Sequence, residues 1–237
     1  MINRLIRSIY NYILKFKSST KDLNNLRIAE NRVVKSIFFM ISLNGCYILI
    51  IICLPLYQSG KLSQAETVNS IFAYCAFTSL LGFVYLPYHP KHYGVNLNNL
   101  KYNLFWGLLI GLNLLVISIL IRFVLIEQGF TEFEFNPRQN LFSVSLYPLS
   151  ALSQEIVIRG FLQSYFFALF RNTKLQYLLS IGLSSIIFSA FHVMFGYIIC
   201  ILAFIFSIFM GIFYEKTRSL IGVFIIHSLT GLALFYF

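Results

Sequence analysis

Long apolar runs separated by short polar segments limit most strongly how this chain of 237 residues can fold. A helix needs about 20 apolar residues to cross the hydrocarbon of a bilayer, where the backbone must satisfy its own hydrogen bonds. The runs that approach or exceed this length are 36–54, 67–86, 102–126, 141–170, 175–195, 196–214 and 220–237. They predict an all-α, polytopic transmembrane helix bundle with about seven spans.

The composition supports an integral, multi-pass membrane protein. Hydrophobic residues make up 58% of the chain and charged residues only 11%, whereas soluble domains carry about 25% charged residues. The net charge of +10 does not indicate a nucleic-acid partner, because the basic residues flank apolar runs. All four cysteines lie inside apolar runs, where they suit packing rather than disulfides or a zinc finger. The expected partner of this surface is the lipid bilayer.

Basic residues also predict the orientation of the chain. With the N-terminus inside, eight Lys and Arg residues precede the first span on the inner side, and the outer loops hold only Lys61 and Arg138. Three further pairs fall on the inner side: Lys91 with Lys101, Arg171 with Lys174, and Lys216 with Arg218. Inner loops of membrane proteins carry such an excess. We therefore expect an inside N-terminus, and the plasma membrane of a bacterium as the location.

The chain divides into a basic N-terminal segment, residues 1–35, and one transmembrane domain, residues 36–237. In the first segment, isoleucine and leucine recur at helical spacing beside basic residues, which predicts a short amphipathic helix on the membrane surface. A disordered basic tail is the alternative. No long linker or repeat divides the remainder.

Two charged residues interrupt the apolar run 141–170. Glu155 and Arg159 are four residues apart, so a helix places them on one face, where they can pair. A charge at the bilayer centre costs roughly 2.5–3.5 kcal/mol on insertion scales, so such residues are usually paired or functional. At 1.5 Å per residue this run would span about 45 Å, so we expect it to tilt, to break near Pro148 or to project from the bilayer. A purely structural ion pair is the alternative interpretation.

Two histidines lie in later apolar runs. His192 follows Phe188 at a spacing of four, and His227 lies near the middle of the last run. A single histidine in a membrane helix is more often a packed hydrogen-bonding residue than a catalyst. Together with Glu155 and Arg159, however, they would form a polar pocket within the bilayer if their helices converge.

In this order, these motifs resemble those of the CAAX prenyl protease and bacteriocin-processing family (CPBP, also called Abi). Its Glu-Glu-x-x-x-Arg motif is matched by residues 154–159, which read Gln-Glu-Ile-Val-Ile-Arg. Its Phe-x-x-x-His motif is matched by Phe188 and His192, and its His-x-x-x-Asn motif by His227 and, imperfectly, Gly231. The resemblance covers residues 141–231.

The resemblance implies an intramembrane endopeptidase. In the family's glutamate-type mechanism, the first motif glutamate and the second-motif histidine activate a water molecule. The last histidine and the asparagine stabilise the oxyanion, and the second glutamate and the arginine support the site. The implied substrate is a hydrophobic or membrane-associated peptide, such as a prenylated C-terminus, a bacteriocin leader or a small membrane protein.

Carried over residue by residue, the catalytic set is Glu155, His192, His227, Gln154 and Arg159, with two departures. Gln154 stands where the water-activating glutamate is expected, and Gly231 stands where the asparagine is expected. A general base contributes about 10²–10⁴-fold and one oxyanion donor about 10²–10³-fold. Either Glu155 serves as the base, with Gln154 orienting the water, or the chain is a catalytically impaired member.

Three alternatives remain from the sequence. Glu155, His192 and His227 are a possible zinc set with an open fourth position, although they lack the tight spacing of His-Glu-x-x-His; the leading interpretation has no cofactor. An inactive member would bind a membrane partner through the same cavity. A transporter or channel would spread polar residues along several helices, whereas here they cluster in three motifs.

Overall fold

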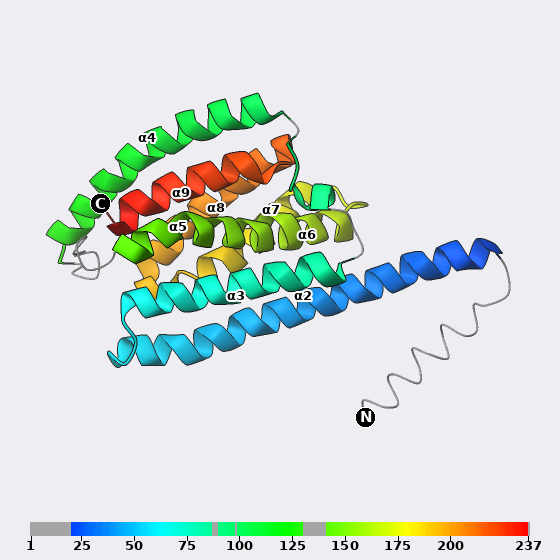
Figure 1. Cartoon of the computed structure of the whole chain (residues 1–237), viewed down its shortest axis with the longest axis horizontal. Coiled ribbons are helices and arrows are strands. Elements are labelled where there is room, and N and C mark those ends of the chain that lie inside the picture. Colours follow the sequence, from blue (N-terminus) through cyan, green and yellow to red (C-terminus); the bar gives the residue numbers. More distant parts are fainter. Residues whose placement is uncertain (1–19, 87–89, 98, 130–140, 237) are drawn as a thin grey trace.

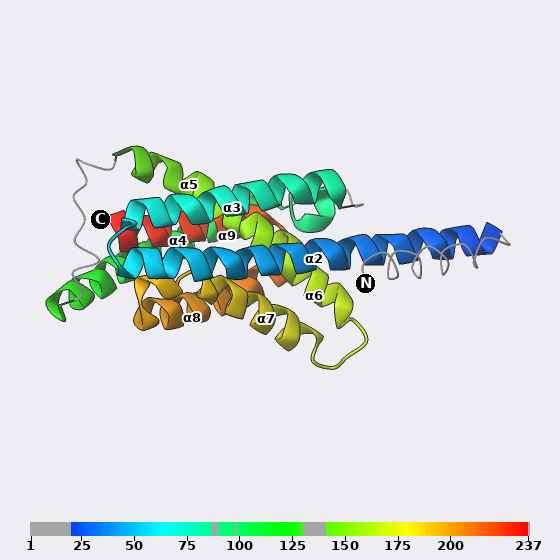
Figure 2. The same ribbon diagram turned by 90° about the horizontal axis from the view of Figure 1, so that it is seen from below.

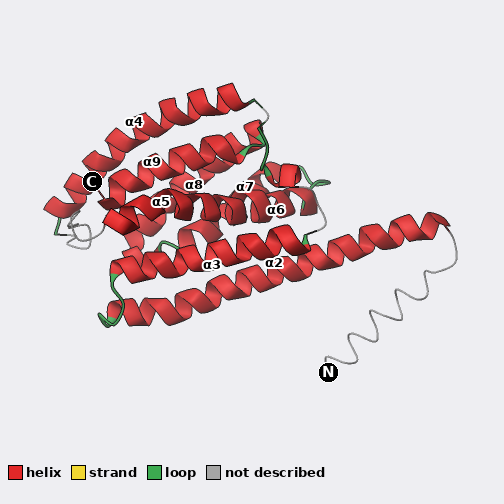
Figure 3. Ribbon diagram, viewed as in Figure 1, coloured by secondary structure: helices red, strands yellow, loops and turns green. Residues whose placement is uncertain are grey.

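The computed structural model describes residues 20–86, 90–97, 99–129 and 141–236, and all regular structure in them is helical (Figure 3). The α-helices are α2 (Thr20–Gln58), α3 (Gln64–Tyr85), α4 (Leu100–Glu127), α5 (Leu141–Glu155), α6 (Ser164–Leu169), α7 (Gln176–Ala190), α8 (Tyr197–Thr217) and α9 (Leu220–Tyr236). Short 3₁₀ turns occur at Pro90–Tyr93 (η1) and Val193–Phe195 (η4), and Ile156–Gln163 (η3) is π-helical.

Within the described part of the chain, three segments are long and apolar enough to cross a membrane: Ser36–Gln58, Leu100–Glu127 and Tyr197–Thr217. The apolar helices Asn69–Val84, Gln176–Ala190 and Leu220–Phe235 are shorter. The all-helical, membrane-type architecture is therefore confirmed. The number of seven spans and the inside N-terminus are not established by these helices.

The first span does not begin as a separate element. α2 continues without a break across the boundary expected between residues 35 and 36, and Pro55 lies inside it rather than closing it. Its N-terminal part projects beyond the other helices (Figures 1 and 2). The predicted surface helix falls largely on residues 1–19, outside the described residues.

The long run 141–170 breaks, but not at its proline. Pro148 is inside α5, and the departure from α-helical geometry comes at η3. A π-helix is rare and commonly marks a functional site, because its wider turn changes the direction of the following side chains. Arg159 lies inside this π-helical segment.

A tight turn separates the fifth and sixth apolar runs. α7 ends at Ala190, and Phe191 to Gly196 reverse the chain before α8 begins. Gly196 has φ of +91°, a conformation that strongly favours glycine. The turn places His192 just beyond the end of α7.

The helices form a bundle around α5, η3 and α9. α4 and α9 lie side by side along one edge, α2 and α3 along the other, and α5 runs between them (Figure 1). α7 and α8 pack together on the face opposite the start of α5 (Figure 2). Small residues let α4 approach α9: a Cβ added at Gly107 would lie 3.1 Å from the Cα of Gly222. Close approach of this kind is how membrane helices gain van der Waals contact.

Candidate active site

Glu155 is the last residue of α5 and is fully buried. Both of its carboxylate oxygens have partners: Oε2 accepts from Nε of Arg159 at 3.3 Å, and Oε1 lies 2.8 Å from Nδ1 of His227 on α9. The ion pair with Arg159 is the one that the spacing of four predicts. Glu155 therefore joins the first and third motifs across 72 residues of sequence.

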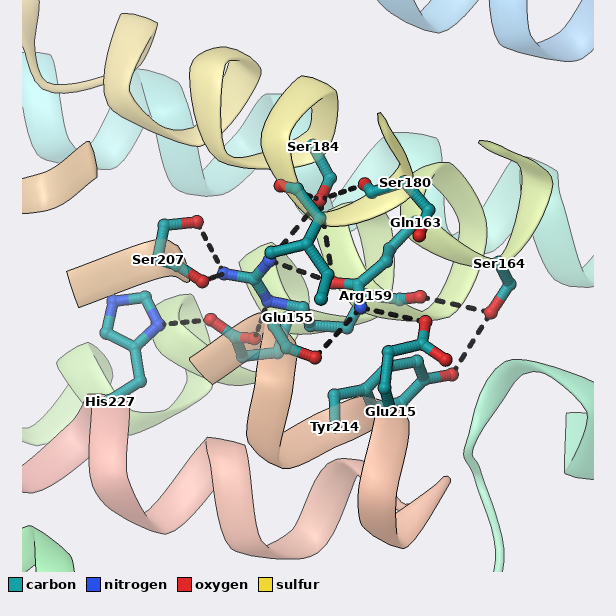
Figure 4. Close-up of polar contacts among 12 residues, drawn as sticks. Glu155, Arg159, Gln163, Ser164, Ser180, Ser184, Ser207, Tyr214, Glu215 and His227 are labelled. Atoms are coloured by element: carbon teal, nitrogen blue, oxygen red, sulfur yellow. Dashed lines mark hydrogen bonds and ion pairs between the residues drawn. The ribbon is translucent and has the colours of Figure 1, made fainter. Parts of the chain in front are cut away.

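Arg159 is held by a complete set of acceptors (Figure 4). Besides Glu155, its Nη1 donates to Oε1 of Gln163 at 3.0 Å and to Ser184, and its Nη2 donates to the backbone and side-chain oxygens of Ser207. These contacts use all five N–H groups of the guanidinium. A buried arginine with this many partners fixes the relative positions of η3, α7 and α8.

A second group of polar side chains extends from Arg159 toward the end of α8. Gln163 donates to the carbonyl oxygen of Gly211 at 3.0 Å and to Oε1 of Glu215 at 2.9 Å. Glu215 in turn forms an ion pair with Arg218, which is partly exposed. The buried polar network thus runs from His227 to the edge of the bundle.

The two histidines are held in the same way. Nδ1 of His192 lies 2.9 Å from the carbonyl oxygen of Phe188, and Nδ1 of His227 faces the Glu155 carboxylate. A carbonyl or an ionised carboxylate only accepts, so each neutral ring donates from Nδ1 and keeps Nε2 as an acceptor. The ring of Phe188 contacts both, with centroids 4.6 Å from His192 and 5.4 Å from His227. The phenylalanine of the second motif therefore positions both histidines.

His192 and His227 line one cavity of about 260 Å³ between α4, α8 and α9. Its wall is mainly apolar, with leucine, isoleucine and phenylalanine side chains from α4 and α8, and Tyr147 and Gly231 complete it near His227. Glu155 is not part of this wall; it lies behind His227. The structure thus gathers the two histidines at the cavity and places the carboxylate behind one of them.

The two residues that depart from the family motifs also have defined surroundings. Gln154 is buried on α5, where its Nε2 donates to Oγ of Ser150 at 3.2 Å, and its Oε1 has no partner among the described residues. A buried acceptor of this kind is able to hold a water molecule. Gly231 lies against the phenol of Tyr147. Gln154 does not line the cavity wall with His192.

The structure brings in residues that the sequence motifs did not single out. The spacing of the sequence could have predicted the contact of Gln163 with Arg159, because the two residues are four apart and lie on the same helix face. Ser184, Ser207 and Glu215 lie on other helices, where they contact Arg159 or Gln163, and no local sequence pattern links them to these residues. Tyr147 reaches the site only through the packing of α5 on α9.

Glu155, His192 and His227 are also the candidate zinc set. Within the described ranges, no three His, Cys, Asp or Glu side chains form a metal-binding group. Zinc binding by Glu155, His192 and His227 would require the Glu155 contacts with both Arg159 and Nδ1 of His227 to be replaced.

Comparison with known proteins identifies one relationship. The family described as "Type II CAAX prenyl endopeptidase Rce1-like" matches residues 136–233, which include every motif residue of the site. Neither the curated proteins nor the solved structures gave a match to the chain. The match confirms the resemblance that the motifs indicate.

Proposed function

Residues 136–233 match the family described as Type II CAAX prenyl endopeptidase Rce1-like, and on this basis we propose that the protein is an intramembrane endopeptidase. It would hydrolyse a peptide bond in a hydrophobic or membrane-associated peptide. One observation carries the proposal: Glu155 holds Nδ1 of His227 at 2.8 Å, and His227 faces an apolar cavity that it shares with His192.

We assign the role of general base to His227, supported by Glu155. A carboxylate on Nδ1 orients the imidazole and stabilises the imidazolium that forms when Nε2 takes a proton. Both oxygens of Glu155 are already bonded and the residue is fully buried, so direct proton abstraction by Glu155 fits this geometry less well. His227 on α9 thereby takes the role of base that a glutamate at position 154 would have in the family motif.

In the proposed reaction, a water molecule in the cavity gives a proton to Nε2 of His227, and its oxygen forms a bond with the carbonyl carbon. The electrons of the carbonyl double bond move to its oxygen. When this intermediate collapses, the C–N bond breaks and the nitrogen takes the proton from the imidazolium. The products are a carboxylic acid and an amine. His192 accepts a hydrogen bond from the same water and orients it.

The surroundings of the two histidines favour a hydrophobic substrate. The cavity is lined mainly by apolar side chains of α4 and α8, which would contact an apolar peptide segment or its lipid group. A prenylated C-terminus and a small membrane protein both have this chemistry. The family match favours the first as the initial compound to assay.

Cleavage of a defined peptide panel tests the proposal. Purified protein in lipid is incubated with prenylated and unprenylated hydrophobic peptides, and products are identified by mass spectrometry. We expect slow cleavage by the wild type, none by His227→Gln, and wild-type cleavage by the control His92→Gln, which changes an exposed histidine on η1. Equal cleavage by wild type and His227→Gln would point to a contaminating protease and overturn the assignment.

A partner-binding protein is the second candidate, favoured by Gln154 and Gly231. The variant Gln154→Glu separates the two functions. In an endopeptidase with a weakened base, the restored carboxylate should raise the rate of cleavage. If neither wild type nor this variant cleaves any peptide, and both co-purify with the same membrane protein, the binding function is supported.

We propose a metal-free reaction, so dialysis against a chelator should leave cleavage unchanged; a loss restored by zinc would support the Glu155, His192 and His227 set instead.

We further propose a single transmembrane domain over 36–237, about seven spans, an inside N-terminus and a bacterial plasma membrane. Labelling of single cysteines placed at positions 61 and 174 with an impermeant reagent should mark only position 61.

A further inference from the structure

The phenol of Tyr147 fills the space in which the side chain of residue 231 would lie. A Cβ added to Gly231 would overlap the hydroxyl oxygen and Cζ of Tyr147 and would lie 2.8 Å from its Cε1. Contacts this short are impossible, so glycine at 231 and tyrosine at 147 form a complementary pair. The pair joins α5 to α9 beside the candidate base.

In the family that the motifs resemble, the side chain at this position stabilises the oxyanion. Residue 231 follows His227 by one helical turn, so a side chain there would lie on the same face of α9, next to the imidazole. Tyr147 reaches this place from the opposite helix and lines the same cavity as His227 and His192. Its ring is 6.3 Å from that of His227, centroid to centroid, in an edge-on arrangement.

We propose that the hydroxyl of Tyr147 is the oxyanion donor of this site, supplied from α5 in place of a side chain at position 231. The inference rests on the proposed endopeptidase function. A tyrosine hydroxyl donates a hydrogen bond at neutral pH, and tyrosine is among the side chains that serve in oxyanion holes. It would stabilise the charge on the carbonyl oxygen while water adds to the carbon. Gly231 is then not a lost catalytic residue but the vacancy that Tyr147 requires.

The pair has a consequence for attempts to restore the family motif. Gly231→Asn alone would not add a donor, because its side chain meets the Tyr147 ring. Either Tyr147 leaves its position or α9 moves away from α5. We expect this single variant to be less stable and less active than the wild type.

Steady-state kinetics of Tyr147→Phe is the principal test. Phenylalanine keeps the ring against Gly231 and removes only the hydroxyl, so the thermal unfolding temperature should hold. Removal of one oxyanion donor lowers kcat by about 10²–10³-fold, and KM should not change. Tyr165→Phe is the matched control, since that hydroxyl contacts Ser36 at 3.2 Å, away from the cavity.

A double variant tests the exchange of the two residues. Tyr147→Ala combined with Gly231→Asn should recover part of the kcat lost by Tyr147→Ala alone.

Binding of a peptide trifluoromethyl ketone separates this inference from the proposed function. Such a ketone hydrates to a tetrahedral form that carries an oxygen at the oxyanion position. We expect Tyr147→Phe to bind it more weakly than the wild type by a factor similar to the loss in kcat. A wild type that cleaves nothing but shows this difference would refute turnover and keep the Tyr147 contact. Equal binding by both proteins, no binding by the wild type, or an unchanged kcat in Tyr147→Phe would overturn the inference.

Discussion

The contact between α4 and α9 and the centre around Arg159 are both buried, but different forces hold them together. Along α4, the face toward α9 carries Gly107 and Gly111, and the opposite face exposes leucine, isoleucine and phenylalanine side chains. Around Arg159, by contrast, buried polar groups meet, and the guanidinium donates to Glu155, Gln163 and Ser207.

The two regions differ in how much their burial stabilises the fold. Apolar helices in lipid associate through close packing, and glycine is sufficient for that at α4 and α9. A buried ion pair contributes little to stability relative to apolar packing, because its desolvation offsets its attraction. The polar centre is therefore better explained by the need to hold Glu155 against His227.

The largest expected effect comes from breaking the polar centre. Arg159→Ala removes the partner of a fully buried carboxylate and leaves the Gln163 and Ser207 acceptors without their donor. Loss of one member of a buried pair typically costs 3–5 kcal/mol. We expect the protein to unfold at a much lower temperature in detergent or to fail to accumulate. Lys216→Ala, on an exposed position of α8, is the control and should be near wild type. Equal stability of the two variants would show that the contacts of Arg159 do not contribute to the stability of the fold.

An intermediate effect is expected from disturbing the apolar contact. Gly107→Val inserts a branched side chain against the backbone of Gly222, whose Cα and O would lie 3.1 and 3.3 Å from the new Cβ. Overpacking of this kind costs about 1–3 kcal/mol. Gly182→Val on α7 is the matched control, since no atom lies within 4 Å of a Cβ there. Thermal unfolding should show a loss for the first variant and almost none for the second. If both behave alike, close approach of α4 and α9 is not what holds them.

The smallest effect is expected where α3 begins, outside both regions. Ser63 and Glu66 form a capping box, and its hydrogen bonds from Ser63 lower the pKa of Glu66 below the usual 4.5. Because the folded-state pKa is lowered, this stabilisation is present above the unfolded-state value and is lost as pH falls through the folded-state value. Glu66→Gln should therefore unfold slightly earlier than wild type at pH 7, with the difference disappearing in acid. A difference that grows in acid would contradict the assignment.

The sequence predicts the helical membrane architecture and the local part of the site. Spacing alone places Glu155 beside Arg159, because this contact lies within one segment. The same spacing would also have found Gln163, although its contact with Arg159 was not predicted from the sequence. The order of the motifs indicates that His227 belongs to the same site, although no local rule gives its contact with Glu155. That contact depends on how α5 packs on α9.

The remaining features depend on packing that a one-dimensional pattern does not encode. Pro148 is the obvious place for a break in the fourth run, yet the chain departs from α-helical geometry at the π-helical segment that contains Arg159. Gly231 looks like a lost donor until Tyr147 is seen beside it, 84 residues earlier in the chain. The number of spans and the catalytic roles of Glu155, His192, His227, Gln154 and Arg159 remain predictions.

The origin of the oxygen in the cleaved peptide tests the central claim most directly, that His227 activates water for peptide hydrolysis. The reaction is run in water enriched in ¹⁸O, with wild type and His227→Gln at equal concentration and with folding verified by thermal unfolding. We predict that the wild-type product carries one ¹⁸O in its new C-terminal carboxylate and that the variant forms no product. Labelled product in equal amounts from both proteins, or no product from the wild type, would contradict the claim.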